Sequence, residues 1–442
     1  MDWTGPDDTT YDDLRAVYNG MIDSRPRLIA SCATPSDVIG ALTHARTEGL
    51  EVAVRSGGHS VAGASSVEDG LVIDVRPMKQ IEIDPSRRTA KVGAGVTWGE
   101  FDAAAQQFGL ATTGGRVSTT GVSGFTLGGG SGWLERQYGL ACDNLIAVDL
   151  VTADGREVRA DANHNPELFW ALHGGGGNFG VATSFEFHLH QVGPNLMAGL
   201  MAWPLEQGAD VGRAFLAWAE SAPDALGTGL VALSGPPEEF IPPHLQGAPI
   251  IGVAALWSGD DAVADDVMAT MRAQEPAVDL VGRMPYVAMQ KMLDDPPGLR
   301  NYWSADFHDE FDEKALDVFL EYGHLRPSPR TQQILFPWGG AVAKLGAQTP
   351  MAQRDAAYVS HPFAVWEDES DDETALRWVR EYRSAIAPFA NGGTYLNFIG
   401  DEGEDRVRAA YGDKSYDRLA AVKAEYDPGN IFHRNQNVRP AG

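Results

Sequence analysis

Hydrophobic and polar positions follow two different periods through the first half of the chain. Short β-branched runs bounded by glycine or proline predict strands, and runs that open with a capping residue predict helices. The predicted strands occupy residues 27–31, 51–57, 70–75 and 88–96. The predicted helices run from a Thr34 cap through Ala45, with Pro35 in the first turn, and from Trp98 to Phe108. Residues 147–160 predict a hairpin that turns at Asp154-Gly155.

The pattern changes after about Gly193-Pro194. From there to about Phe398, apolar strands alternate with helices, and seven of the eleven tryptophans lie in this span. The predicted strands are residues 196–203, 230–235, 249–257 and 361–368, and the predicted helices are Asp261–Arg272 and Asp371–Ala385. The remaining residues return to helix and end in a polar segment. This order predicts an α+β protein whose middle part is an antiparallel sheet backed by helices, suited to hold a substrate.

Composition narrows the class of protein. The 442 residues carry 61 acidic and 34 basic side chains, a formal net charge of -27, and 43% of them are hydrophobic. Such a chain has material for large cores, and its charge argues against nucleic acid or an anionic membrane as a partner. The simplest meaning of the charge is solubility.

Two cysteines, Cys32 and Cys142, cannot build a disulfide framework or a four-ligand zinc site. Both stand in apolar surroundings that suit buried thiols, although a single bridge is the alternative. The acidic amino terminus lacks the features of a signal peptide, and no run of about eighteen apolar residues could span a membrane. We therefore expect a cytoplasmic protein.

Fifty glycines are many, and they cluster in three loops. The clusters are Arg55–Ser60 (RSGGHS), Gly121–Trp133 (GVSGFTLGGGSGW) and His173–Gly180 (HGGGGNFG). Consecutive glycines let the backbone approach a ligand and present several N–H groups to phosphate oxygens. Three such loops predict a long ligand that contains a pyrophosphate.

Gly175, Gly177 and Gly180 formally satisfy the dinucleotide motif G-x-G-x-x-G. That motif needs a strand before it and a helix after it, so that the pyrophosphate meets the start of the helix. Here residues 165–173 predict a helix and residues 181–190 predict a strand. Because the order is reversed, we reject a Rossmann NAD site.

The glycine loops and the carboxyl terminus together resemble one known family. RSGGHS after an apolar strand, GGRVSTTGVSGFTLGGGSGWLERQYGL, FWALHGGGGNFGVAT and the terminal YDPGNIFHRNQNVRP occur in the order found in the vanillyl-alcohol-oxidase superfamily, in its berberine-bridge-enzyme-like branch. The resemblance covers nearly the whole chain and is weak from about 195 to 390. It implies a two-part PCMH-type FAD-binding domain in residues 1–194, a substrate domain in 195–398 and a return to the FAD domain in 399–442.

In this family the histidine of the first loop is bonded through a ring nitrogen to the 8-methyl carbon of the flavin, and His59 stands at its place. A tethered imidazole raises the reduction potential of the flavin and prevents its loss. The alternative is a histidine that only makes hydrogen bonds within a tight turn.

Many relatives have a second link, to a cysteine just before the second glycine loop, where this chain has Val117. The resemblance therefore implies a single covalent link, as in the hydroxynicotine-oxidase-like members, and a smaller or more enclosed pocket.

The resemblance also implies which other residues hold the cofactor. The first loop should bind the pyrophosphate, the second should run beside the flavin, Val181 should lie near the adenine, and the terminal asparagines should approach the flavin ring, unless they only form turns. These residues are Arg55, Ser56, Gly57, Gly58, Ser60, Val117, Thr120, Gly121, Gly124, Gly128, Gly129, Val181, Asn435 and Asn437.

Oxidation of an alcohol or amine moves a hydride to the flavin and a proton to a base, and a positioned base contributes about 10²–10⁴-fold. Relatives often use a tyrosine in a Y-x-N segment, which Tyr395 and Asn397 match. On a strand, both would point to one face. A tyrosine pKa starts near about 10, so the role needs a favourable neighbour. The alternative is an ordinary core tyrosine.

Other candidate functional residues have weaker support. His188 and His190 alternate along a strand but lack further ligands nearby, so no metal site is expected. Glu367 and Asp368 begin an acidic run typical of a solvated surface. Trp338 and Tyr358 are either walls of a substrate pocket or core residues.

We interpret the chain as an FAD-dependent oxidase that acts on a small alcohol, amine or phenol and passes electrons to molecular oxygen. A dehydrogenase with another acceptor is the near alternative, and Thr120 is our candidate for the position that controls access of oxygen to the flavin. A tailoring enzyme that uses a flavin–oxygen adduct and a flavin-holding binding protein without turnover are further alternatives. The substrate and the oligomeric state are not readable from the sequence.

Overall fold

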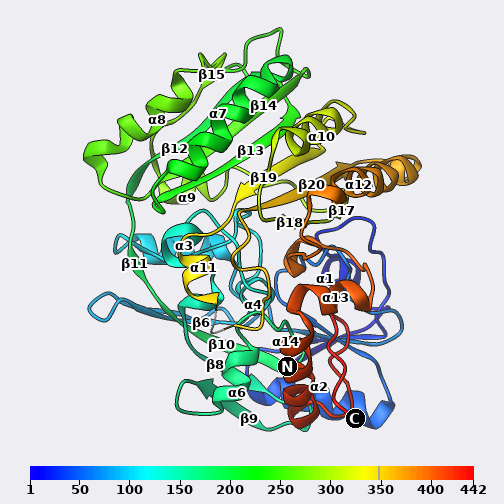
Figure 1. The fold of residues 1–442 in the computed structure, drawn as a ribbon. Helices are drawn as coiled ribbons and strands as arrows, with labels where there is room; N and C mark the ends of the chain where they lie inside the picture. Colours follow the sequence, from blue (N-terminus) through cyan, green and yellow to red (C-terminus); the bar gives the residue numbers. More distant parts are fainter. Residues whose placement is uncertain (347–348) are drawn as a thin grey trace.

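The computed structural model describes residues 1–346 and 349–442, and within them the strands form four sheets (Figure 1). Two smaller sheets, a two-stranded ribbon and their helices fill the lower half of the view. A large sheet with helices on its outer face fills the upper half. The mixed helix-and-strand content agrees with the predicted α+β class.

The first sheet has the strand order β1-β2-β4-β3, in which β2, β4 and β3 run parallel. Its strands are β1 (Asp2–Thr4), β2 (Leu28–Ser31), β3 (Val52–Arg55) and β4 (Leu71–Asp74), and its helices are α1 (Tyr11–Arg15) and α2 (Pro35–Glu48). Helix α2 begins at the predicted cap, where Thr34 Oγ1 accepts a hydrogen bond from the N–H of Asp37 at 3.2 Å. It continues three residues beyond Ala45 and ends at Gly49, whose φ of 65° suits glycine.

The second sheet is antiparallel, with the order β5-β6-β10-β8-β9. Its strands are β5 (Ile81–Asp84), β6 (Thr89–Gly93), β8 (Leu145–Val151), β9 (Glu157–Asp161) and β10 (Val181–His188). Strands β8 and β9 form the hairpin predicted at Asp154-Gly155. The same region contains α3 (Trp98–Gln106), α4 (Val122–Leu127), α5 (Glu135–Tyr138), α6 (Pro166–Ala171) and the ribbon of β7 (Leu110–Ala111) with β11 (His190–Gln191). Helix α6 precedes the third glycine loop and β10 follows it, the order that excludes a Rossmann motif.

The large sheet is antiparallel, with the order β15-β12-β14-β13-β19-β20-β17; β16 pairs with β12, and β18 with β20. Its strands are β12 (Asn195–Pro204), β13 (Leu226–Ser234), β14 (Pro249–Trp257), β15 (Val278–Asp279), β16 (Gly282–Pro285), β17 (Arg300–Trp303), β18 (Asp306–His308), β19 (Gln332–Pro337) and β20 (Tyr358–Trp366). The helices of this region are α7 (Gly208–Ser221), α8 (Ala264–Arg272), α9 (Tyr286–Met289), α10 (Glu313–His324), α11 (Ala341–Lys344) and α12 (Asp372–Ile386).

Alternation along these strands separates two faces. Met201, Val253 and Leu335 pack under the outer helices with Phe215 and Phe319. The neighbouring residues of the same strands, such as Ile334 and Phe336 of β19, join the core that faces the lower half. The large sheet therefore presents one side to its helices and the other to the glycine loops.

The chain then returns to the lower half through α13 (Glu404–Tyr411) and α14 (Asp413–Tyr426) (Figure 1). Short 3₁₀ helices lie at Cys142–Asn144, Leu205–Gln207, Asp261–Val263, Glu369–Asp371, Ala387–Phe389 and Leu396–Phe398. Cys32 and Cys142 are buried and free. In the part of the chain that the structure describes, no helix has the length and apolar character needed to cross a bilayer.

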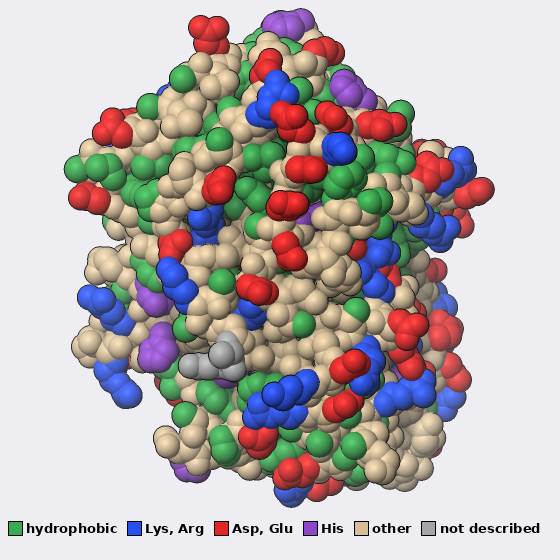
Figure 2. Space-filling model, in the orientation of Figure 1, with side chains coloured by type: hydrophobic (Ala, Val, Ile, Leu, Met, Phe, Trp, Pro, Cys, Tyr) green, Lys and Arg blue, Asp and Glu red, His purple; other side chains and the backbone are tan. Residues whose placement is uncertain are grey.

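The surface reflects the acidic composition. Figure 2 shows Asp and Glu side chains spread over the visible face, with Lys and Arg scattered among them rather than gathered in a continuous patch. A phosphate backbone would find no basic groove on this face.

A buried ion pair holds the carboxyl-terminal segment in place. Lys423 and Asp427 are both 0% exposed, and Lys423 Nζ lies 2.8 Å from Asp427 Oδ2. The ammonium group also donates to the carbonyl oxygens of Asn178 and Phe432, at 2.8 and 2.9 Å. Asp427 accepts hydrogen bonds from the N–H groups of Ile431 and Phe432. The pair thus joins the third glycine loop to the end of the chain.

We expect Lys423→Met to destabilise the protein by about 3–5 kcal/mol, because it leaves the Asp427 carboxylate buried without its cation. Arg213→Met, which breaks the exposed pair with Asp210, should leave the thermal midpoint unchanged. Thermal unfolding of both variants measures the difference. Equal midpoints would show that the buried pair contributes no more than a surface pair.

Candidate active site

A cavity of about 340 Å³ lies between the glycine loops and the large sheet. Residues 56–62, 115–128 and 174–180 contribute to one wall, together with residues 432–436 of the carboxyl-terminal segment. Trp303, parts of β19 and β20, and residues 396–399 form the facing wall. The three glycine loops, predicted to share one ligand, all line this one cavity.

The first loop begins where β3 ends. Arg55 does not line the cavity. Its buried guanidinium donates hydrogen bonds to the carbonyl oxygens of Leu14 and Ala16, which connects the start of the loop to the end of α1. Ser56, Gly57, Gly58 and Ser60 do line the cavity. Gly58 has a φ of 73°, which suits glycine.

The backbone of this loop is free to bind a ligand. The N–H groups of residues 57–62 donate no hydrogen bond to any residue that the structure describes. Buried N–H groups are almost always paired, so a row of free donors along a cavity fits a ligand rich in acceptor oxygens. The diphosphate of the expected cofactor is such a ligand.

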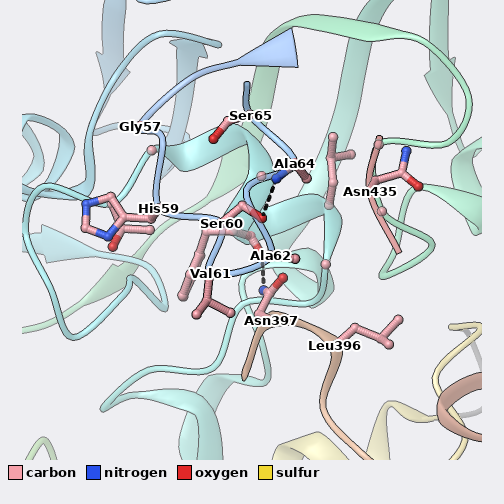
Figure 3. A pocket seen from close by; sticks show the side chains of 18 of the residues that line it. Gly57, His59, Ser60, Val61, Ala62, Ala64, Ser65, Leu396, Asn397 and Asn435 are labelled. Carbon is pink, nitrogen blue, oxygen red and sulfur yellow. Dashed lines mark hydrogen bonds between the residues drawn. The ribbon is translucent and has the colours of Figure 1, made fainter. Parts of the chain in front are cut away.

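His59 projects from the first loop at one side of the pocket, and Asn435 lies at the other (Figure 3). The Nε2 atom of His59 lies 2.9 Å from Thr119 Oγ1, and the ring stacks on Tyr18 with centroids 4.0 Å apart. Burial lowers the pKa of His59 to about 4. The imidazole is therefore neutral near neutral pH, with a lone pair on one ring nitrogen.

The second loop passes close to the first. A Cβ added to Gly57 would lie 2.2 Å from the nitrogen of Gly121, and one added to Gly121 would lie 2.3 Å from the nitrogen of Gly57. Val117, Thr120, Gly121, Gly124 and Gly128 line the cavity, as expected, whereas Gly129 does not. A Cβ on Gly124 would meet nothing within 4 Å, because it would project into the cavity.

The third glycine loop and the carboxyl-terminal segment form the end of the cavity away from His59. Gly174, Gly176, Gly177, Gly180 and Ala182 line the cavity there, but Val181 does not. Asn435 lies beside Gly177, and its Oδ1 atom is buried without a partner among the described residues. Asn437 does not line the cavity. The structure thus brings Asn435, but not Asn437 or Val181, to the predicted site.

Tyr395 and Asn397 do not lie on a strand, contrary to our expectation. Tyr395 is the extended residue just before the 3₁₀ helix Leu396–Phe398, and Asn397 lies within that helix. They still touch, with Asn397 Nδ2 3.1 Å from Tyr395 Oη. Asn397 lines the cavity and packs on Gly128, where a Cβ would come within 2.0 Å of its Oδ1.

The position of Tyr395 weighs against a role as base, which stays a prediction. Its side chain is fully buried and does not line the cavity. Its hydroxyl accepts hydrogen bonds from the N–H groups of Gly130 and Ser131, at 2.7 and 2.9 Å. Burial raises the pKa of Tyr395 well above its usual value, because the surrounding core disfavours a phenolate.

Other predicted residues lie elsewhere. Trp338 and Tyr358 are core residues outside the cavity lining; Trp338 packs on Phe307 and Tyr395. Exposed Glu367 pairs with Arg330 at 2.9 Å. His190 stacks on Tyr138, and across residues 1–346 and 349–442 no group of three metal-ligating side chains comes together.

The wall contributed by the large sheet was not predicted from the sequence. Ile334 and Phe336 of β19 and His361 and Phe363 of β20 line the cavity, since alternate residues of adjacent strands share one face. Trp303 stacks on Phe363 with centroids 4.8 Å apart. A histidine within a mostly apolar strand, directly after Ser360, was the signal available in the sequence.

Comparisons with known proteins agree with this geometry. Residues 26–161 match the family model described as FAD binding domain, and residues 394–439 match the one described as berberine and berberine like. The chain is 32% identical to (R)-6-hydroxynicotine oxidase of Paenarthrobacter nicotinovorans, over 99% of this chain and 96% of that one. It is 28% identical to aclacinomycin-N/aclacinomycin-A oxidase of Streptomyces galilaeus, over 98% and 89%.

The fold has a counterpart among solved structures. The crystal structure of 6-hydroxy-D-nicotine oxidase from Arthrobacter nicotinovorans superimposes with a TM-score of 0.90 at 28% identity, over 100% of this chain and 98% of that one. These findings confirm the predicted PCMH-type FAD-binding fold and FAD as the cofactor.

We expect Gly124→Val to lower the FAD content of purified protein roughly tenfold or more, because the new side chain would occupy space meant for the cofactor. The ratio of flavin to protein absorbance measures it. Gly282→Val, at an open position outside the cavity, is the matched control and should retain FAD. Full flavin content in both variants would place the cofactor elsewhere.

Proposed function

The chain belongs to the FAD-linked oxidoreductases that combine an FAD-binding domain with a berberine-like carboxyl-terminal segment, and we propose that it is an oxidase with flavin attached to His59. In this proposal, residues 1–194 and 399–442 hold the cofactor and residues 195–398 recognise a small alcohol, amine or phenol. The observation that carries the proposal is the place of His59 on the cavity wall, in a loop whose N–H groups at residues 57–62 donate to no residue that the structure describes.

Bound FAD would accept a hydride from the substrate and pass the electrons to molecular oxygen, which becomes hydrogen peroxide. The residues of this chain would bind the cofactor, orient the substrate and enclose the reacting atoms. The free N–H groups of residues 57–62 would hold the diphosphate, and the facing glycines leave room for it. The aromatic wall of the large sheet would exclude water from the reacting carbon.

A covalent link to His59 is supported by the state of its ring. A neutral imidazole keeps a lone pair, and the hydrogen bond to Thr119 Oγ1 together with the stack on Tyr18 fixes its orientation. Val117 lines the cavity where relatives have a second attachment cysteine, and both cysteines of this chain are buried elsewhere. We therefore propose one link.

Oxygen as the electron acceptor is supported by the relatives, since the hydroxynicotine and aclacinomycin enzymes are both named oxidases. Thr120 lines the cavity and remains our candidate for the position that controls access of oxygen. Anaerobic mixing with a panel of alcohols, amines and phenols tests turnover, because a substrate must bleach the flavin absorbance. In air, one hydrogen peroxide should form per substrate oxidised. Bleaching that is reversed only by an artificial dye would indicate a dehydrogenase.

We expect wild-type protein to keep its yellow colour in the pellet after acid precipitation, and His59→Ala to release the flavin into the supernatant. The reason is that only a covalent bond survives unfolding. Flavin fluorescence of a denaturing gel reports the same difference. His188→Ala, at an exposed position outside the cavity, should behave as wild type. Flavin released equally from all three proteins would contradict the covalent link.

A further inference from the structure

His361 is a buried histidine that opens onto the cavity. It lies in β20, is 4% exposed, and lines the wall opposite the glycine loops. Its ring stacks on Phe398, with centroids 4.2 Å apart, and meets the edge of Trp303 at 6.1 Å. Trp303 in turn meets Tyr18, which stacks on His59. A short chain of aromatic rings thus connects His361 to the proposed flavin attachment point.

The hydrogen bonds of His361 fix its tautomer. Nδ1 lies 2.8 Å from the carbonyl oxygen of Ser304, which can only accept, so Nδ1 carries the proton. In the neutral ring, Nε2 then keeps its lone pair. Nε2 makes no hydrogen bond to any described residue. Because His361 lines the cavity, this lone pair is available there.

The other ionisable groups on the cavity are poorly suited to take a proton. Among the described residues that line it, none is Asp, Glu or Lys. Arg116 and Arg434 carry hydrogen-bond donors and no acceptor, and Arg116 pairs with Glu135 at 3.1 Å. Tyr411 donates to the carbonyl oxygen of Gly174 at 3.1 Å, and burial raises its pKa far above neutrality. His59 is the proposed attachment residue.

We propose that His361 is the catalytic base, and that its Nε2 takes the hydroxyl proton of an uncharged, flat aromatic alcohol. This inference rests on the proposed function and names its substrate class. The carbon-bound hydrogen leaves as hydride to the flavin, the hydroxyl proton goes to Nε2, and the C–O bond becomes a carbonyl. Oxygen takes up the hydride equivalent and a proton, and the imidazolium returns its proton to solvent.

The surroundings of His361 favour an uncharged substrate. Trp303, Phe363 and Phe398 offer flat aromatic faces, and no carboxylate on the described lining could pair with an ammonium group. Arg116 is the charged group whose field reaches His361, and it would repel a second cation. A simple amine is protonated at neutral pH. An alcohol, by contrast, is uncharged, so it can enter the cavity without the cost of removing a charge from water.

The same surroundings set the pH dependence. Burial, with a smaller effect of Arg116, lowers the pKa of His361 to about 4, while the Ser304 carbonyl opposes the shift. The base is therefore unprotonated across the neutral range. We expect flavin reduction to be independent of pH from about 6 to 9 and to fall only as pH approaches 4. A tyrosine base would instead give a rate that still rises above pH 9.

The test uses flavin-loaded protein and a panel of substituted benzyl alcohols and benzylamines under anaerobic conditions. His361→Asn keeps a donor for Ser304 but removes Nε2, so we expect the reduction rate with alcohols to fall about 10²–10⁴-fold. The non-oxidisable 2-phenylpropan-2-ol, followed by its perturbation of the flavin spectrum, should bind roughly three- to tenfold more weakly to this variant. Nitrogen NMR of wild-type His361 should show the Nδ1–H tautomer, with the Nε2 signal shifted by the same alcohol.

His308→Asn is the matched control. His308 is also buried, and bonds Phe389 and Ser360 outside the cavity lining, so this variant should lose stability without losing rate. Unchanged rate and binding in His361→Asn would overturn the inference, as would benzylamines reacting faster than the alcohols at pH 7. A larger loss in Tyr395→Phe than in His361→Asn would return the role to Tyr395. Wild-type flavin that no alcohol, amine or phenol bleaches would instead refute the proposed function.

Discussion

The close approach of two main-chain segments, at Gly57 and Gly121, is the constraint on which the site depends. A side chain on either residue would collide with the backbone of the other. Beside this contact, the N–H groups of residues 57–62 donate to no residue that the structure describes, and His59 lies within hydrogen-bond distance of Thr119. The ion pair of Lys423 and Asp427 supports the opposite end by joining the third loop to the carboxyl-terminal segment. Main chain therefore shapes one wall of the cavity.

The facing wall has a different origin. It consists of side chains from one face of a large antiparallel sheet, whose other face is committed to packing under helices. The two walls are under different constraints. The glycine loops need residues that can adopt their backbone conformation. The sheet residues can change their side chains without disturbing the hydrogen bonds between strands. His361 illustrates this, since Val359 and Phe363, two residues away on the same face of β20, are apolar and His361 adds an ionisable group to the wall.

Local patterns were sufficient to predict most of the elements and the FAD-binding loops. The Thr34 cap, the Asp154-Gly155 turn and the order of α6 and β10 depend on residues close in sequence, and the structure confirms them. The positions of the other candidate site residues depend on packing between segments far apart in the sequence. Tyr395 and Asn397 looked like a strand pair, but the chain forms a 3₁₀ helix at Leu396–Phe398, where Tyr395 contacts Gly130 and Asn397 contacts Gly128. His361 was missed because its exposure to the cavity depends on strands and loops far away in sequence.

The central claim is that one FAD lies along the glycine loops and is bonded to His59. Mass spectrometry of the denatured protein tests it most directly. The account predicts a single species whose mass equals the chain plus one FAD less two hydrogens, with the added mass on the tryptic peptide of residues 56–79, which contains His59 as its one histidine. A chain of unmodified mass, or flavin bound to any other peptide, would contradict the account.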